Sequence, residues 1–150
     1  MEIRKVVSRG EPANRHLVYA PGMEEKRGIV ETLVGMSNAE GGTVVVGAEV
    51  NEKGVPTVHR DVASGASFIS EIETELQGPV QPELSCRTEQ FRLGGSRFVS
   101  FTVSPSDRIR SIPDESSERP VFPYHSRSEL EHLSGNDIDY FLELNSSRQR

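Results

Sequence analysis

The sequence contains no tryptophan, a single cysteine and only three lysines among its 150 residues. Because Cys86 stands alone, the chain cannot form an internal disulfide or a zinc site built from several thiolates. The four histidines show no short ligand spacing, so no metal site is predicted. No run approaches the roughly 20 apolar residues that span a bilayer, and residues 1–10 lack an apolar leader. These absences predict a cytoplasmic protein without a membrane segment, a metal or a cofactor.

Positive charge is also scarce, because 17 basic residues stand against 23 acidic ones and the net charge is −6. This balance argues against a surface that is basic all over, of the kind that grips nucleic acid without further structure. Most of the basic residues are arginines, whose planar guanidinium binds carboxylates and phosphates through paired hydrogen bonds. Any anion-binding surface must therefore be local and built from arginines.

Residue spacing predicts an α/β (α+β) fold in one domain that spans residues 1–150. Apolar residues at helical spacing predict helices over Met23–Asn38 and Ser64–Gln77, and a capping serine predicts a C-terminal helix from Ser134. The polar segment Ser104–Arg119 is typical of a long mobile loop. Short turns between strands favour a mixed, largely antiparallel sheet. The predicted strands are Glu2–Val7, His16–Tyr19, Thr43–Val50, Val55–His59, Leu84–Leu93, Ser96–Val103 and Pro120–His125.

The clearest candidate site is a hairpin whose two strands flank Gly94-Gly95. A two-residue turn places Arg92 directly opposite Arg97. Like charges across a ladder are destabilising unless an anion lies between them or both enter solvent. A protruding, arginine-tipped hairpin can neutralise phosphates; the alternative is a pair of solvated arginines that guards a sheet edge. The same basic strip could continue through Arg108, Arg110, Arg119 and Arg127.

A second motif joins the first long helix to the strand after it. Asn38 lies in the last helical turn, and the glycine pair Gly41-Gly42 leads into the run Thr43–Gly47. Phosphate-binding glycine loops precede a helix N-terminus, where N–H groups point outward. Here the glycines follow a helix C-terminus, which exposes carbonyl groups, so a glycine cap that lets the chain reverse is favoured. The pattern of an ATP-hydrolysing P-loop is absent from the sequence.

This motif closely resembles the signature of the Schlafen-type AlbA domain, a divergent AAA-like family to which DNA binding is ascribed. In that family a helix ending in Ala-Phe-Ala-Asn-Thr-x-Gly-Gly runs into a strand of the Gly-Gly-Thr-hydrophobic type. The resemblance covers about residues 15–143 and implies the family's fold and its association with DNA. The residues that match the family's structural motif are Asn38, Gly41, Gly42, Thr43 and Gly47.

The chain departs from the family at the positions that matter for catalysis. In nuclease-active Schlafens, two carboxylates before the first helix and an aspartate after the buried strand form a metal-assisted RNA-cleaving site. At the matching places the sequence has Leu17–Ala20 and Ala13, so that only Glu49 remains. The family's Tyr-x-Arg strand is also altered, because His125 stands where the arginine would be and Arg127 follows two residues later. The chain is therefore not expected to be an enzyme.

The residues and the resemblance together predict a non-catalytic module that binds DNA or RNA, mainly through the phosphate backbone. Two alternatives stay open: a protein-interaction or scaffold domain that has lost nucleic-acid binding, and a diverged, metal-dependent endoribonuclease of the Schlafen type. A protein partner or a homodimer is compatible with either binding role. The predicted nucleic-acid contacts are Arg92, Arg97, Arg108, Arg110, Arg119, His125 and Arg127.

Overall fold

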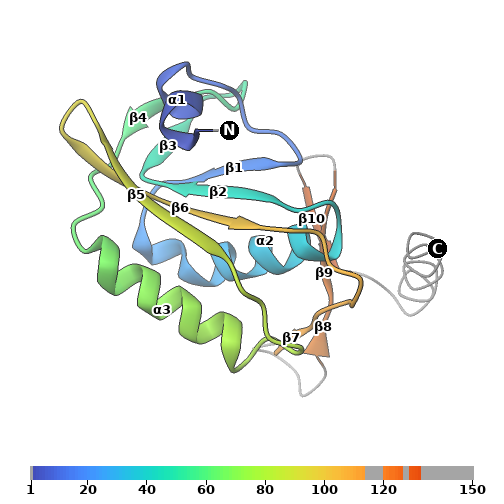
Figure 1. The fold of residues 1–150 in the computed structure, drawn as a ribbon. Coiled ribbons are helices and arrows are strands. Elements are labelled where there is room, and N and C mark those ends of the chain that lie inside the picture. Colours follow the sequence, from blue (N-terminus) through green and yellow to red (C-terminus); the bar gives the residue numbers. More distant parts are fainter. Residues whose placement is uncertain (1, 114–119, 127–128, 133–150) are drawn as a thin grey trace.

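The computed structural model describes residues 2–113, 120–126 and 129–132 (Figure 1). The C-terminal helix predicted from Ser134 lies outside these ranges. The elements in chain order are α1 (Ile3–Ser8), β1 (Leu17–Ala20), the 3-10 turn η1 (Met23–Glu25), α2 (Lys26–Asn38), β2 (Gly42–Val46), β3 (Ala48–Val50), β4 (Pro56–His59), α3 (Gly65–Gln77), β5 (Arg87–Leu93), β6 (Ser96–Val103), β7 (Ile112–Pro113), β8 (Pro120–Val121), β9 (Pro123–Ser126) and β10 (Glu129–His132).

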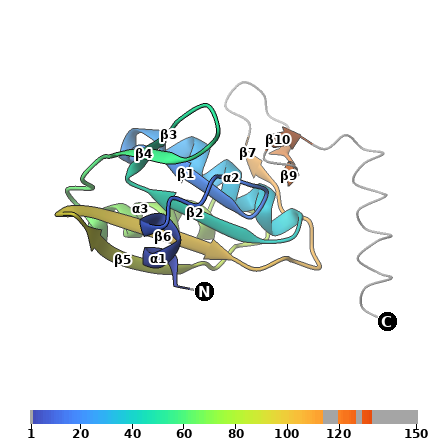
Figure 2. The ribbon, with the colours of Figure 1, turned by 90° about the horizontal axis from the view of Figure 1, so that it is seen from above.

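A four-stranded sheet with the order β1-β2-β6-β5 forms the centre of the molecule. The strands β1 and β2 are parallel and are joined through α2, whereas β2-β6 and β6-β5 are antiparallel pairs. The pairs β3-β4, β7-β8 and β9-β10 form small two-stranded sheets around it. The predicted mixed, largely antiparallel sheet with two main helices is confirmed (Figures 1 and 2).

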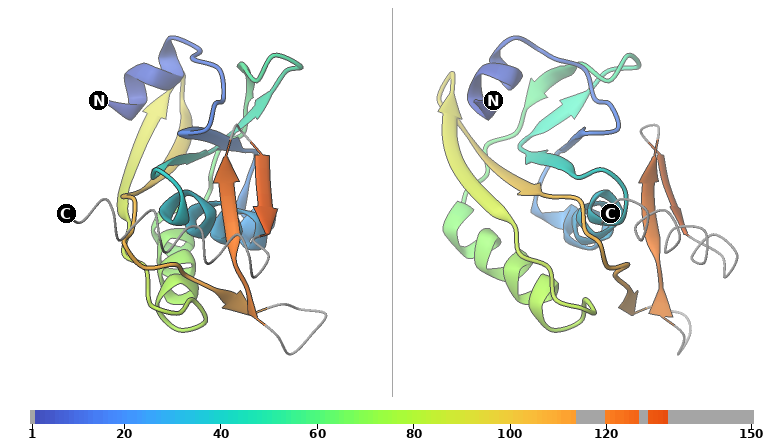
Figure 3. Two further views of the ribbon diagram at one scale, coloured as in Figure 1. Left: turned by 90° about the vertical axis from the view of Figure 1, so that its right-hand side faces the viewer. Right: turned by 45° about the vertical axis from the view of Figure 1, so that its right-hand side comes forward.

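Both faces of the central sheet are covered by helices. On one face α2 and α3 enclose the larger core, in which Leu33, Phe68 and Phe101 are fully buried. On the other face the short helix α1 packs against the sheet through Val6, which lies in one cluster with Phe98. The hairpin β9-β10 lies along the outer side of α2 (Figure 3). None of the helices in the described part of the chain is long and apolar enough to cross a bilayer.

Three of the predicted strands are wrong in detail. The strand predicted over Pro120–His125 is divided into β8 and β9, which belong to separate two-stranded sheets. The segment predicted as a strand over Glu2–Val7 is the helix α1, because Ile3, Val6 and Val7 are spaced for a helix and are all buried against the sheet. The single strand predicted over Thr43–Val50 is divided into β2 and β3 at Gly47, whose φ is +128°. The Gly47 N–H bonds to Ala20 while its carbonyl accepts from Arg60, which redirects the chain out of the central sheet.

The segment predicted as a long mobile loop is held in place over its described part, residues 104–113. The Ser106 N–H donates to the carbonyl of Ser37 at 2.8 Å, and Ser111 exchanges two backbone hydrogen bonds with Gln81. Residues 112–113 then pair with β8. The segment is ordered because backbone groups of α2 and of the chain after α3 accept and donate its hydrogen bonds, which its polar composition does not reveal.

Candidate nucleic-acid interface

The tip of the β5-β6 hairpin has the register predicted from the sequence. Gly94 and Gly95 have φ values of +56° and +84°, as a type I′ turn requires. Arg92 is the cross-strand partner of Arg97. The two guanidinium groups therefore start from directly opposite positions on the same face of the hairpin, and their repulsion needs a compensating charge.

Asp61 supplies that compensating charge. Its carboxylate accepts from Nε and Nη2 of Arg97 at 2.9 and 2.7 Å, and from the Arg97 backbone N–H at 2.9 Å. The side-chain hydrogen bonds from Arg97 hold the pKa of Asp61 below its usual value, with a smaller contribution from the charge of Arg92. The same contacts raise the pKa of Arg97. The anion that Arg97 binds is thus a side chain of this protein, and the charge of Arg92 also acts on it.

Arg92 has no comparable ion pair with any residue in the described ranges, and its side chain is exposed. Arg4 from α1 lies beside it, because the Arg4 Nε donates to the Arg92 carbonyl at 3.0 Å. Sequence reasoning missed Arg4 because it predicted a strand there. The helical spacing of Ile3, Val6 and Val7 was the signal that could have placed Arg4 on a helix over the sheet.

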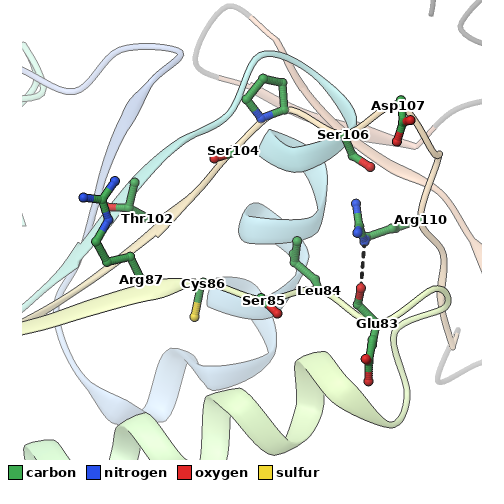
Figure 4. A pocket seen from close by; sticks show the side chains of 11 residues that line it. Glu83, Leu84, Ser85, Cys86, Arg87, Thr102, Ser104, Ser106, Asp107 and Arg110 are labelled. Carbon is green, nitrogen blue, oxygen red and sulfur yellow. Dashed lines mark hydrogen bonds between the residues drawn. The ribbon is translucent and has the colours of Figure 1, made fainter.

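At the opposite end of the hairpin, an open groove of about 640 Å³ lies between the start of β5 and the segment after β6 (Figure 4). Arg110 reaches across it and donates from Nε to the carbonyls of Pro82 and Glu83 at 3.1 and 3.2 Å, and from Nη1 to the Ser37 hydroxyl at 3.1 Å. Burial lowers the pKa of Arg110 from its ordinary value. Arg110 therefore holds the wall of the groove together. The groove is lined by Glu83, Leu84, Ser85, Cys86, Arg87, Thr102, Ser104, Pro105, Ser106, Asp107 and Arg110.

Two further arginines at this end of the hairpin are exposed. Arg108 lies two residues before Arg110, and its backbone N–H bonds to the Ser106 hydroxyl at 3.1 Å. Arg87 begins β5 at the rim of the groove and was not among the predicted site residues, because the sequence argument considered the tip of the hairpin and the segments after it, not the start of β5. Neither guanidinium forms an ion pair with a described residue.

Several residues of the motif that resembles the Schlafen-type AlbA signature make structural contacts. Asn38 is fully buried and donates from Nδ2 to the carbonyls of Arg110 and Pro123 at 2.9 and 2.8 Å, while its Oδ1 accepts from the Arg110 N–H at 2.7 Å. Gly41 has a φ of +81° and donates back to the Met36 carbonyl at the end of α2. The Thr43 hydroxyl bonds to the hydroxyl of Thr102 at 2.9 Å. Asn38 thereby fixes the backbone at Arg110, two residues after Arg108.

The remaining predicted contacts are not on the surface that the structure describes. His125 is 4% exposed, and its Nδ1 lies 3.3 Å from the carbonyl oxygen of Arg15. Burial lowers the pKa of His125, the positive charge that His16 can carry lowers it further, and the hydrogen bond to Arg15 works in the opposite direction. Arg119 and Arg127 lie outside the described residues. Within the described residues, the predicted contacts outside the buried His125 are thus the arginines of the hairpin tip and of the groove.

The buried His125 makes stability depend on pH. Because its pKa is lower in the folded state, the unfolded chain binds more protons as the pH falls below about 6.5, and the free energy of unfolding decreases there. Urea unfolding at pH 7.5 and pH 5 should show this loss in the wild type. The loss should be smaller in His125→Gln and unchanged in the exposed His59→Gln. An equal loss in His125→Gln would show that other groups cause it.

The positions of the Schlafen nuclease carboxylates hold no acidic cluster within the described ranges. The residues Leu17–Ala20 form β1, and no group of three or more histidine, cysteine or acidic side chains is placed to hold a metal ion there or elsewhere in the described chain. Glu49 is instead bound to Arg60, whose Nε donates to its carboxylate at 2.6 Å.

The comparisons with known proteins identify the fold. No known family profile and no curated protein sequence matches the chain. Among solved structures, the chain is similar to the N-terminal domain of a putative ATP-dependent DNA helicase RecG-related protein from Nitrosomonas europaea. Its TM-score is 0.56 at 13% identity, over 68% of this chain and 70% of that one. It is also similar to the DIP2311 protein from Corynebacterium diphtheriae, with a TM-score of 0.63 at 13% identity. That match covers 97% of this chain but spans only about a third, 32%, of the other.

Proposed function

We propose that the chain is a nucleic-acid-binding module that contacts the phosphate backbone through Arg92 and Arg4 at the hairpin tip and through Arg108 beside the groove. The observation that carries the proposal is that these three guanidinium groups are exposed and form no ion pair within the described chain. Arg4 uses only its Nε, on the Arg92 carbonyl, whereas Arg97 is bound to Asp61 and Arg110 donates to three acceptors. An arginine without an internal partner can give its paired donors to a phosphate. Arg92 lies next to the turn of the β5-β6 hairpin with Arg4 beside it, whereas Arg108 follows the far end of β6.

Two similarities support this proposal. The helix-Gly-Gly-Thr motif resembles that of the Schlafen-type AlbA family, to which DNA binding is ascribed. The fold is also similar to that of an N-terminal domain from a RecG-related protein, which is named as a DNA helicase. The identity of 13% supports a shared fold, and the nucleic-acid role is inferred from the arginines together with these similarities.

We further propose that the module is non-catalytic. Phosphodiester hydrolysis by bound metals needs clustered carboxylates, and the strand where the Schlafen nucleases place them is Leu17–Ala20 in this chain. Glu49, the one carboxylate that remains of the pattern, is engaged by Arg60. Metal-dependent cleavage of RNA by the purified protein would contradict this part of the proposal and favour a diverged endoribonuclease.

The net charge of −6 limits how strong the binding can be. With about three phosphate contacts, the logarithm of the binding constant should fall with the logarithm of salt concentration with a slope of about −3. Such a protein binds measurably at low salt and poorly at physiological salt, unless a second domain or a second copy adds contacts.

A charge-reversal experiment tests the interface. The double variant Arg92→Glu with Arg108→Glu should bind a fluorescent DNA or RNA duplex at least about tenfold more weakly at low salt, and its salt slope should shrink by about two. The matched control is Lys26→Glu with Lys53→Glu, which changes the net charge equally at the start of α2 and in the β3-β4 turn. Fluorescence anisotropy measures both.

Each outcome of this experiment decides between two functions. Equal losses in the two double variants would show that only the net charge matters and would contradict the proposed interface. Failure of the wild type to bind any duplex at low salt would favour the protein-interaction domain instead. The observation that supports this second function is that Arg97, one of the two arginines of the predicted pair, is already bound to Asp61.

A further inference from the structure

The strand β5 is a long edge of the central sheet, and within the described chain Arg4 contacts its outer backbone groups at Arg92, near the hairpin tip. The strand order ends at β5, which pairs only with β6 within the described residues (Figures 1 and 2). Its seven residues, Arg87–Leu93, contain no proline and no lysine, and their pairing with β6 shows no bulge. Proteins often protect exposed edges with prolines, lysines or bulges, because an open edge can pair with a strand of another chain.

The backbone groups that β5 presents at this edge can be assigned. In a hairpin with a two-residue turn, Leu93 and Ser96 form a hydrogen-bonded pair, so every second residue before Leu93 also bonds to β6. The intervening residues Thr88, Gln90 and Arg92 direct their N–H and C=O groups away from the sheet. The hydrogen bond from Arg4 agrees with this alternation, because the Arg4 guanidinium reaches the Arg92 carbonyl on the side of β5 that faces away from β6. The backbone groups of Thr88 and Gln90 have no partner within the described chain.

We propose that two copies of this chain pair through β5, antiparallel, with a two-fold axis at Thr88. In this register, Thr88 faces Thr88 of the partner subunit as a hydrogen-bonded pair. Arg87 then lies opposite Glu89 of the partner subunit, and the symmetry creates this pair twice. Both side chains are exposed and neither has an ion pair with a described residue. Cross-strand pairs of opposite charge stabilise a sheet.

The charges select this register among the neighbouring ones. Moving the axis to Glu89 places two carboxylates directly opposite each other, which is destabilising. Moving it to Gln90 places Glu89 opposite Phe91 of the partner subunit and leaves the arginines without a partner. A pairing shifted by a single residue would place Thr88 opposite Glu89 of the partner subunit. The backbone groups of Glu89 are already bonded to β6, so such a register cannot form a ladder.

This dimer goes beyond the proposed function and does not depend on it. It also has a geometric consequence for the groove. Arg92 lies four residues from Thr88, about 13 Å along the strand, and Leu84 lies the same distance on the other side. The hairpin tip of each copy is therefore directed toward the groove of the other.

Charge variants test the dimer by sedimentation equilibrium of the full chain without nucleic acid. Arg87→Glu and Glu89→Arg each turn both cross-strand pairs into repulsive ones, so each should raise the dimer dissociation constant about tenfold or more. The double variant, which exchanges the two charges, restores both pairs and should return the constant to near the wild-type value. Lys53→Glu is the control for net charge.

Mixing the two single variants tests the cross-strand pairing of positions 87 and 89 most directly. A chain with Glu at positions 87 and 89 complements a chain with Arg at both, so the mixture should form heterodimers more tightly than either variant forms homodimers. The proposal is overturned if the wild type stays monomeric at millimolar concentration. It is equally overturned if the wild-type dimer is insensitive to both single variants, which would place the interface elsewhere. Neither result bears on duplex binding by a monomer, so the two proposals fail separately.

Discussion

Replacing Asn38 with alanine is expected to lower the free energy of unfolding by about 3 kcal/mol or more. The side chain is fully buried and makes three hydrogen bonds to the backbone of two other segments. Alanine leaves the N–H and the carbonyl of Arg110 and the carbonyl of Pro123 without these partners. A buried polar backbone group that loses its partner costs about 1–3 kcal/mol, and water has little access here.

Urea unfolding followed by circular dichroism measures this loss, and the midpoint should fall while the slope stays the same. Asn14→Ala is the matched control, because Asn14 is exposed and its side chain accepts one hydrogen bond in the described chain, from the His16 N–H. It should cost about 1 kcal/mol or less. A similar small cost for Asn38→Ala would mean that the segment after β6 is held without this side chain.

The role of Asn38 connects the family motif to the proposed interface. Asn38 ends α2 and fixes the backbone of Arg110, and Ser37 next to it bonds to both the Arg110 side chain and the Ser106 N–H. Arg108 lies between these two anchored residues. The motif can therefore determine where Arg108, the arginine proposed to bind phosphate, is placed, and Asn38→Ala should weaken duplex binding only as far as it releases this segment.

The sequence predicted those features that depend on local periodicity. The helices near α2 and α3 follow from apolar residues at helical spacing, and the β5-β6 register follows from the length of the Gly94-Gly95 turn alone. The placement of Arg92 opposite Arg97 needed no knowledge of the rest of the molecule. The short helix α1 was missed because only a few apolar residues define it, and its burial against the far face of the sheet is decided by tertiary packing.

The site was less predictable than the fold because its chemistry depends on distant residues. Asp61 lies 36 positions before Arg97, in the connection between β4 and α3, and nothing in its local sequence marks it as the partner of the hairpin. Arg110 and Asn38 are separated by 72 positions. The internal contacts of Arg97 and Arg110 and the burial of His125 therefore could not be read from the sequence alone.

The second large effect is expected from Gly41→Ala, which should lower the free energy of unfolding by about 2–4 kcal/mol. The φ of +81° costs a residue with a Cβ about 1 kcal/mol or more. A Cβ at this position would also lie 2.8 Å from the carbonyl oxygen of Val103 and 2.9 Å from Cδ of Pro105. Both neighbours belong to the backbone or to a rigid ring, so the contact can be relieved only by moving β6 or α2, and such overpacking costs about 1–3 kcal/mol.

Gly94→Ala separates the cost of the positive φ from the cost of the close Cβ contacts. Gly94 also has a positive φ, +56°, but a Cβ there would have no heavy atom within 4 Å. Its substitution should therefore show the conformational cost alone, about 1 kcal/mol. The difference between the two variants in urea unfolding measures how closely the end of α2 approaches the strand that leads to the arginine-bearing segment. Equal losses would show that this approach is loose and that Gly41 is required only for its backbone conformation.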